Sequence, residues 1–135
     1  MNGIELKKEE FKPDNEKYDI FEKNVEKEGG RGQLMFTDKK LKAEEIKLNS
    51  KAEEVLAIKI DTDKGDSLVI ALMYRSPSST KEDSKLIRQA IEEISNMNSS
   101  DIIIMGDFNY KEINWMKMEV GRNKINLSHV YNKIC

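Results

Sequence analysis

The sequence predicts a fold of the mixed α+β or α/β class, and three features support this assignment. Residues 68–74 and 102–105 are apolar runs of strand length, within strands expected at 67–74 and 101–105. The stretch between them has apolar residues at helical spacing, namely Leu86, Ile87, Ala90, Ile91, Ile94 and Met97. A strand, a crossover helix and a second strand form a βαβ unit, so we expect the two strands to be parallel neighbours.

The ends and faces of these elements follow from local patterns. Ser79 and Glu82 have the S-x-x-E spacing of a capping box, so the helix is expected to begin there. The four apolar residues from Ile102 to Met105 are typical of a strand that is buried on both faces.

The first half of the chain predicts further strands. We expect them at residues 18–21, 33–36, 44–48 and 55–60. Leu56, Ile58 and Ile60 alternate and should share one face of the last of these strands. A polar loop with Gly65 at a position of positive φ should then form the turn into the strand that begins near residue 67.

Composition narrows the classes of function. The 135 residues suffice for one domain with a real core. The chain has 23 Lys and Arg against 25 Asp and Glu, a balance that argues against strong non-specific binding of nucleic acid by the whole chain. Cys135 is the only cysteine, which favours a reducing compartment. No apolar run approaches the roughly 18 residues that span a bilayer, so we expect no membrane association.

The clearest functional feature follows the strand at 101–105. Gly106 frees the backbone, and Asp107 and Asn109 then stand at i and i+2, which in an extended segment places both side chains on one face. Such a pair could orient a water for phosphodiester hydrolysis or bind a divalent cation. The same tetrapeptide also forms ordinary Asx turns, and that alternative stays open. Tyr74 ends the neighbouring parallel strand and should lie beside Asp107.

Several motifs, in order along the chain, resemble one known family. They are GGRGQLMF at 29–36, EEVLAIKI at 53–60, YRSP at 74–77 and GDFNYKEINW at 106–115. Together they resemble the endonuclease/exonuclease/phosphatase family, most closely the endonuclease domains of jockey- and CR1-type non-LTR retrotransposons. The resemblance covers roughly residues 18–115 and implies part of a four-layer α/β sandwich, in which helices flank two packed mixed sheets.

The resemblance also implies roles for individual residues. Asp107 would orient or deprotonate the attacking water, and Asn109 would contact the scissile phosphate or a metal-bound water. Tyr74 matches the strand-end tyrosine that contacts the phosphate, and Arg75 is a further candidate for a phosphate or DNA contact. Mg²⁺ would be the cofactor, held by Asp107 and Asn109, and DNA would be the partner.

The family pattern is incomplete in this chain. The family's metal-binding Asn and Glu have no counterpart before residue 18, and its C-terminal Asp and His have none after residue 115. His129 lacks the preceding Asp, so we expect it to have no catalytic role. We therefore expect a charged N-terminal segment (1–17), a partial domain truncated at both ends (18–115) and a C-terminal tail (116–135) that either continues the domain or is unrelated to it. A chain without the family Glu and His should be a very poor nuclease.

Three hypotheses follow. The chain is an endonuclease domain that acts in the nucleus within a longer polypeptide carrying a reverse transcriptase. Alternatively, it is a non-catalytic remnant or interaction module with the same fold. The third alternative is a phosphatase of small phosphoesters, which the retrotransposon-like motifs make less favourable. In each case the sheet edges left open by truncation would invite self-association.

Overall fold

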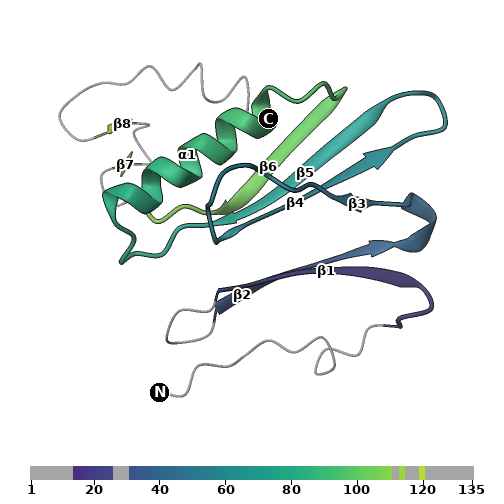
Figure 1. Ribbon diagram of the computed structural model, residues 1–135, viewed down its shortest axis with the longest axis horizontal. Helices are drawn as coiled ribbons and strands as arrows, with labels where there is room; N and C mark the ends of the chain where they lie inside the picture. Colours follow the sequence, from purple (N-terminus) through teal and green to yellow (C-terminus); the bar gives the residue numbers. More distant parts are fainter. Residues whose placement is uncertain (1–13, 26–30, 111–112, 115–118, 121–135) are drawn as a thin grey trace.

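The computed structural model describes residues 14–25, 31–110, 113–114 and 119–120 (Figure 1). Predictions that concern residues 1–13, Gly29, Gly30, Trp115 or His129 lie outside these ranges, as does all of the predicted tail except Glu119 and Val120. The elements are β1 (Tyr18–Val25), β2 (Arg31–Asp38), the 3-10 helix η1 (Lys39–Leu41), β3 (Glu44–Glu45), β4 (Val55–Asp61), β5 (Ser67–Tyr74), α1 (Lys81–Ser95), β6 (Asp101–Asp107), β7 (Ile113–Asn114) and β8 (Glu119–Val120).

The main sheet has four strands in the order β3-β4-β5-β6. The strands β3, β4 and β5 pair in antiparallel fashion, whereas β5 and β6 are parallel and are joined through α1. The predicted βαβ unit is therefore confirmed. The turn between β4 and β5 also has the expected glycine, because Gly65 has φ of 87°. The hairpin of β1 and β2 forms a second sheet, and β7 pairs with β8 in a third.

The helix α1 begins one residue later than the capping-box prediction. Its N-cap is Thr80, whose hydroxyl accepts a hydrogen bond from the Asp83 amide at 3.1 Å, while the Asp83 carboxylate accepts one from the Thr80 amide at 2.8 Å. The prediction of Ser79 and Glu82 was wrong because the Ser79 amide donates to the Ser76 carbonyl in the preceding turn. The same spacing occurs twice in the sequence, in Ser79 with Glu82 and in Thr80 with Asp83. The turn after Tyr74 selects the second pair as the capping box.

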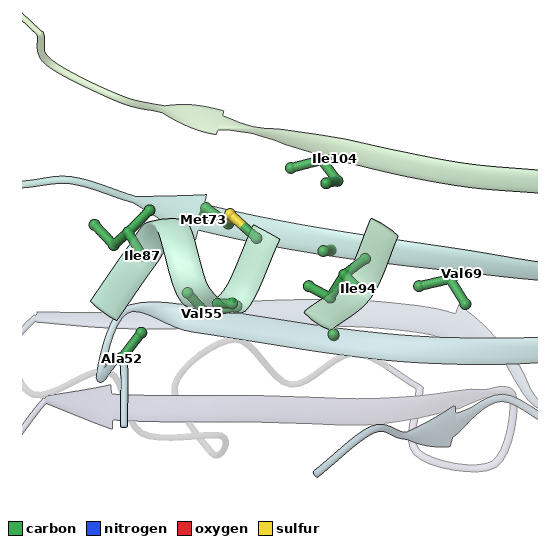
Figure 2. Close-up of a cluster of buried hydrophobic side chains, with 10 residues drawn as sticks. Ala52, Val55, Val69, Met73, Ile87, Ile94 and Ile104 are labelled. Atoms are coloured by element: carbon green, nitrogen blue, oxygen red, sulfur yellow. The ribbon is translucent and has the colours of Figure 1, made fainter. Parts of the chain in front are cut away.

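The core lies between α1 and one face of the main sheet. Figure 2 shows Ile87 and Ile94 of the helix over Val55, Met73 and other strand side chains. The buried members of this core are Ala52, Val55, Ala57, Val69, Ala71, Met73, Ile87, Ala90, Ile94 and Ile104. Because these strand residues alternate along β4 and β5, the remaining strand residues point to the opposite face.

The β1–β2 hairpin lies on that opposite side of the sheet (Figure 1). Leu56, Ile58 and Ile60 point toward it and are at most 8% exposed, so the predicted shared face of these three residues is confirmed. The amide group of Gln33 in β2 donates to the carbonyls of Glu54 and Leu72 at 3.2 and 3.3 Å. The hairpin is thus attached to the sheet by apolar burial and by side-chain hydrogen bonds to the backbone.

The prediction that β6 is buried on both faces was wrong. Ile104 points toward α1 and is 6% exposed, but Ile103 and Met105 are 40% and 47% exposed. The strand stands at the end of the main sheet, and the β1–β2 hairpin packs over β4 instead. Ile103 and Met105 therefore form an apolar stripe on an edge strand.

Several strand lengths also differ from the prediction: β2 and β6 extend beyond the expected 33–36 and 101–105, and two further differences have a clear cause. The strand expected at 44–48 is paired only at Glu44 and Glu45, with one further bond from the Ile46 amide to the Ala57 carbonyl. The chain then leaves β4, and the amides of Asn49 and Ser50 donate to the side chain of Glu93. The strand expected at 18–21 extends to Val25, since it pairs with β2 along its whole length.

These elements define an α+β fold in which α1 and the hairpin lie on opposite sides of the main sheet. This arrangement is compatible with a partial sandwich, although the described elements do not establish four layers. No helix in the described part of the chain has the length and apolar character that crossing a bilayer requires.

Candidate active site at the carboxyl ends of β5 and β6

Tyr74 and Asp107 are the final residues of two parallel strands and lie directly opposite each other. The Arg75 amide donates to the Asp107 carbonyl at 2.8 Å, which continues the ladder one step past the end of β5. Alternation places both side chains on the face of the sheet away from α1, the same face as Ile103 and Met105. The proximity expected from the βαβ topology is therefore confirmed, while the catalytic roles remain predictions.

Asp107 and Tyr74 differ in accessibility. Asp107 is exposed, whereas Tyr74 is half-buried and its amide donates to the Glu54 carbonyl at 3.0 Å. A carboxylate at an open strand end can meet an extended substrate such as a nucleic acid backbone. The half-buried phenol beside it is held on the rigid part of the sheet.

Asn109 does not share an extended face with Asp107, contrary to the prediction. β6 ends at Asp107, and Asn109 has φ of 42°, in the left-handed region. The Asn109 amide donates to Asp107 Oδ1 at 3.3 Å, so the alternative Asx turn is present. The Asp107 carboxylate is nevertheless close to the backbone of Asn109, whose side chain is directed to the Arg75 carbonyl after β5.

The side chain of Asn109 is fixed by the neighbouring strand end. Its Nδ2 donates to the Arg75 carbonyl at 2.9 Å, and Arg75 Nη1 donates to the Asn109 carbonyl at 2.9 Å. These two hydrogen bonds run in opposite directions between the same pair of residues. The pair joins the segment after β5 to the segment after β6.

Arg75 makes further contacts that its position at a loop did not predict. Its Nε donates to the Ser84 hydroxyl at 3.1 Å, and its guanidinium lies over the ring of Tyr110, 4.3 Å from the ring centroid. Tyr110 was not identified from the sequence. The only signal was an aromatic residue directly after the Gly-Asp-Phe-Asn segment, and an aromatic residue at that place is equally typical of packing.

The described residues offer few metal ligands at this site. No group of three or more His, Cys, Asp or Glu side chains gathers within the ranges that the structure describes. Asp107 and Asn109 supply one carboxylate and one carboxamide oxygen. These are donors of the type that Mg²⁺ prefers, and Mg²⁺ commonly takes only one or two protein carboxylates and completes its shell with water and phosphate.

A pocket of about 310 Å³ is formed by the loop that follows β5, the start of α1 and neighbouring segments. Ser76, Ser78, Thr80, Asp83 and Glu54 contribute to its lining, together with apolar residues of α1. Neither Tyr74 nor Asp107 lines it. The helix end at this pocket is already capped by Asp83, so its carboxylate occupies the place that an anion would take.

Comparison with known families agrees with this geometry. Residues 68–133 match the family model described as endonuclease-reverse transcriptase. The match includes nearly all of β5, and all of α1 and β6, and hence Tyr74, Asp107 and Asn109. The match supports an endonuclease/exonuclease/phosphatase-type domain, of the kind found in retrotransposon-like proteins, in this part of the chain. No curated protein and no solved structure matches the chain.

Proposed function

We propose that this domain carries part of the catalytic centre of a Mg²⁺-dependent endonuclease that hydrolyses phosphodiester bonds in DNA. The observation that carries the proposal is the pairing of Tyr74 with Asp107 at adjoining strand ends, with Asn109 folded beside them. The family match of residues 68–133 supports the endonuclease class over a phosphatase of small phosphoesters.

Each residue has a chemical role in this proposal. Asp107 accepts a hydrogen bond from the attacking water and orients or deprotonates it. Asn109 donates a hydrogen bond to the phosphate or accepts one from a metal-bound water, and its orientation is fixed by Arg75. The Tyr74 phenol donates to a non-bridging phosphate oxygen on the same face of the sheet. Donors fixed in advance stabilise the charge that develops on phosphorus in the transition state.

Mg²⁺ fits this site by the chemistry of its donors. The carboxylate of Asp107 and the carboxamide oxygen of Asn109 would hold the ion. Bound Mg²⁺ supplies neutralisation of negative charge on the phosphate and lowers the pKa of a coordinated water. Asp107 would serve both the ion and the attacking water, so its removal should be more harmful than that of any other single group described here.

The turnover of this chain by itself should be low. The proposed site has one carboxylate, one carboxamide and one phenol. Among the residues that the structure describes, it has no second carboxylate to complete a metal site, and no cationic side chain on the side of the phosphate opposite the attacking water. Groups that act as a unit fail together, so the remaining rate should fall by orders of magnitude. We propose that full activity belongs to a longer polypeptide that also carries a reverse transcriptase and acts on nuclear DNA.

A specific observation favours a second candidate function, that of a non-catalytic interaction module. Ile103 and Met105 are exposed on an edge strand, and such strands readily pair with another chain. In this case the residues at the strand ends would keep the fold of the family without its chemistry.

A nicking assay on supercoiled plasmid with Mg²⁺ distinguishes the two. The wild type is compared with Asp107→Ala and with a matched control, Asp101→Ala, which removes an exposed aspartate from the opposite end of the same strand. We expect slow, Mg²⁺-dependent nicking by the wild type and by Asp101→Ala, and none by Asp107→Ala. If the wild type shows no nicking, or Asp107→Ala nicks equally well, catalysis by this site is wrong and the interaction module remains.

A further inference from the structure

Arg75 is held by three different groups of its own chain. Its guanidinium donates to the Asn109 carbonyl and to the Ser84 hydroxyl, and it lies over the Tyr110 ring. We infer that Arg75 is a positioning residue, which fixes the conformation of Asn109, and that it is not a DNA contact. Its consequence for catalysis rests on the proposed function, whereas its structural role does not.

Asn109 needs such support because its backbone is in an unfavourable conformation. A φ of 42° lies in the left-handed region, which is sterically unfavourable for residues other than glycine. Asparagine tolerates this region better than most residues, but the conformation persists only where surrounding contacts impose it. Here the Asn109 carbonyl and side-chain amide are both bonded to Arg75.

The guanidinium is in turn fixed to the helix. Ser84 lies in the first turn of α1, and its hydroxyl accepts from Arg75 Nε and donates to the Thr80 carbonyl at 3.0 Å. Arg75 therefore connects α1 with the ends of β5 and β6. These are the three elements of the βαβ unit, so the candidate catalytic loop is set by the packing of the whole unit.

Lysine could not replace arginine in this arrangement. The planar guanidinium donates in two directions at once and stacks on the Tyr110 ring, whereas an ammonium is a point charge on a flexible stem. A DNA contact would depend chiefly on positive charge, which lysine keeps. The substitution Arg75→Lys therefore separates the two roles.

The test is amide hydrogen exchange of the full chain, measured by NMR without DNA or metal. We compare wild type with Arg75→Lys and with the control Arg88→Lys, which alters an exposed arginine of α1. Loss of a charge-assisted hydrogen bond of this kind should speed exchange of the Asn109 amide about tenfold in Arg75→Lys. Exchange in Arg88→Lys should match the wild type.

A milder variant guards against general unfolding. Ser84→Ala removes the acceptor of Arg75 Nε together with the hydroxyl's own bond to the Thr80 carbonyl. It should speed exchange of the Asn109 amide by a smaller factor, while exchange of the Ala57 amide in the sheet stays unchanged. If Asn109 exchange is unaltered in both Arg75→Lys and Ser84→Ala, the positioning role is wrong. Failure of the proposed nuclease function would appear separately, as absence of nicking by a wild type whose exchange pattern is as expected.

A second readout excludes a DNA contact. The salt dependence of DNA binding should keep its slope in Arg75→Gln if the residue only positions the loop. A phosphate contact would instead reduce the slope by about one and overturn the inference.

Discussion

Gly106 lies against the carbonyl oxygen of Met73 so closely that no other residue fits. A Cβ atom on Gly106 would be 1.7 Å from that oxygen, and φ at this position is +155°. Met73 and Gly106 form the pair directly before Tyr74 and Asp107 in the parallel ladder. The glycine thus allows β6 to approach β5 at the step that sets the distance between the two candidate catalytic side chains.

Replacing Gly106 with alanine should therefore damage both stability and site. The new methyl group would meet backbone that cannot rotate away, so we expect the free energy of unfolding to fall by about 3 kcal/mol or more. Gly65→Ala is the matched control, because Gly65 also has positive φ but has nothing within 4 Å of its Cβ position. That variant should lose about 1 kcal/mol from backbone strain alone.

Urea unfolding of both glycine variants measures this difference. Equal losses would mean that strain and not the contact with Met73 governs residue 106. A Gly106→Ala variant that kept wild-type stability would show that β5 and β6 do not approach as closely as the structure indicates.

Local sequence patterns predicted where the helices and strands of this fold lie better than they predicted which other elements pack against them. The βαβ unit was predictable because hydrophobic periodicity changes from strand to helix and back between residues 67 and 105. Burial on both faces of β6 was not, because a run such as Ile102 to Met105 says nothing about which elements reach it. The face with Ile103 remained exposed since the hairpin packs over β4.

This difference between the faces of β6 makes a second prediction. Ile104→Ala should lower the free energy of unfolding by about 3 kcal/mol, because it leaves a cavity under α1. Ile103→Ala, its neighbour on the open face, should cost about 1 kcal/mol or less. Chemical denaturation of the two variants at low protein concentration provides the comparison.

The dependence of the unfolding midpoint on protein concentration is a control for the comparison of Ile103→Ala with Ile104→Ala. If Ile103→Ala proves as costly as Ile104→Ala, another surface covers β6, and the midpoint of the wild type should then rise with protein concentration. This result would support the self-association that open sheet edges predict.

In the candidate site, too, the position of the strand ends was predictable from the sequence, whereas individual side-chain contacts were not. Tyr74 and Asp107 could be placed together from the sequence because parallel strands joined by one helix end at one edge. The contacts of Arg75 with Asn109 and Tyr110 could not. They depend on the left-handed backbone conformation of Asn109. The spacing of residues does not reveal this conformation, and a glycine at this position would have indicated it more clearly than asparagine does.

The segment at residues 49–50 is attached to α1 through the side chain of Glu93. The Glu93 carboxylate accepts hydrogen bonds from the amides of Asn49 and Ser50, at 2.9 and 3.2 Å, and from the Asn49 side chain at 3.0 Å. The hydrogen bond from the Asn49 amide is the main cause that holds the pKa of Glu93 below its ordinary value of 4.5. These bonds favour the charged form and attach residues 49–50 to the helix.

A lowered pKa in the folded state fixes the sign of the pH dependence. The unfolded chain takes up the proton first as pH falls, so the stabilisation from Glu93 is complete above pH 4.5 and is lost as pH falls through the folded pKa. Glu93→Gln should therefore lower the unfolding midpoint at pH 7 and approach the wild type at pH 3. Glu92→Gln, at the adjacent exposed position, should differ little from wild type at either pH. A Glu93→Gln deficit that stays constant from pH 7 to pH 3 would mean that the carboxylate acts through its shape and not through its charge.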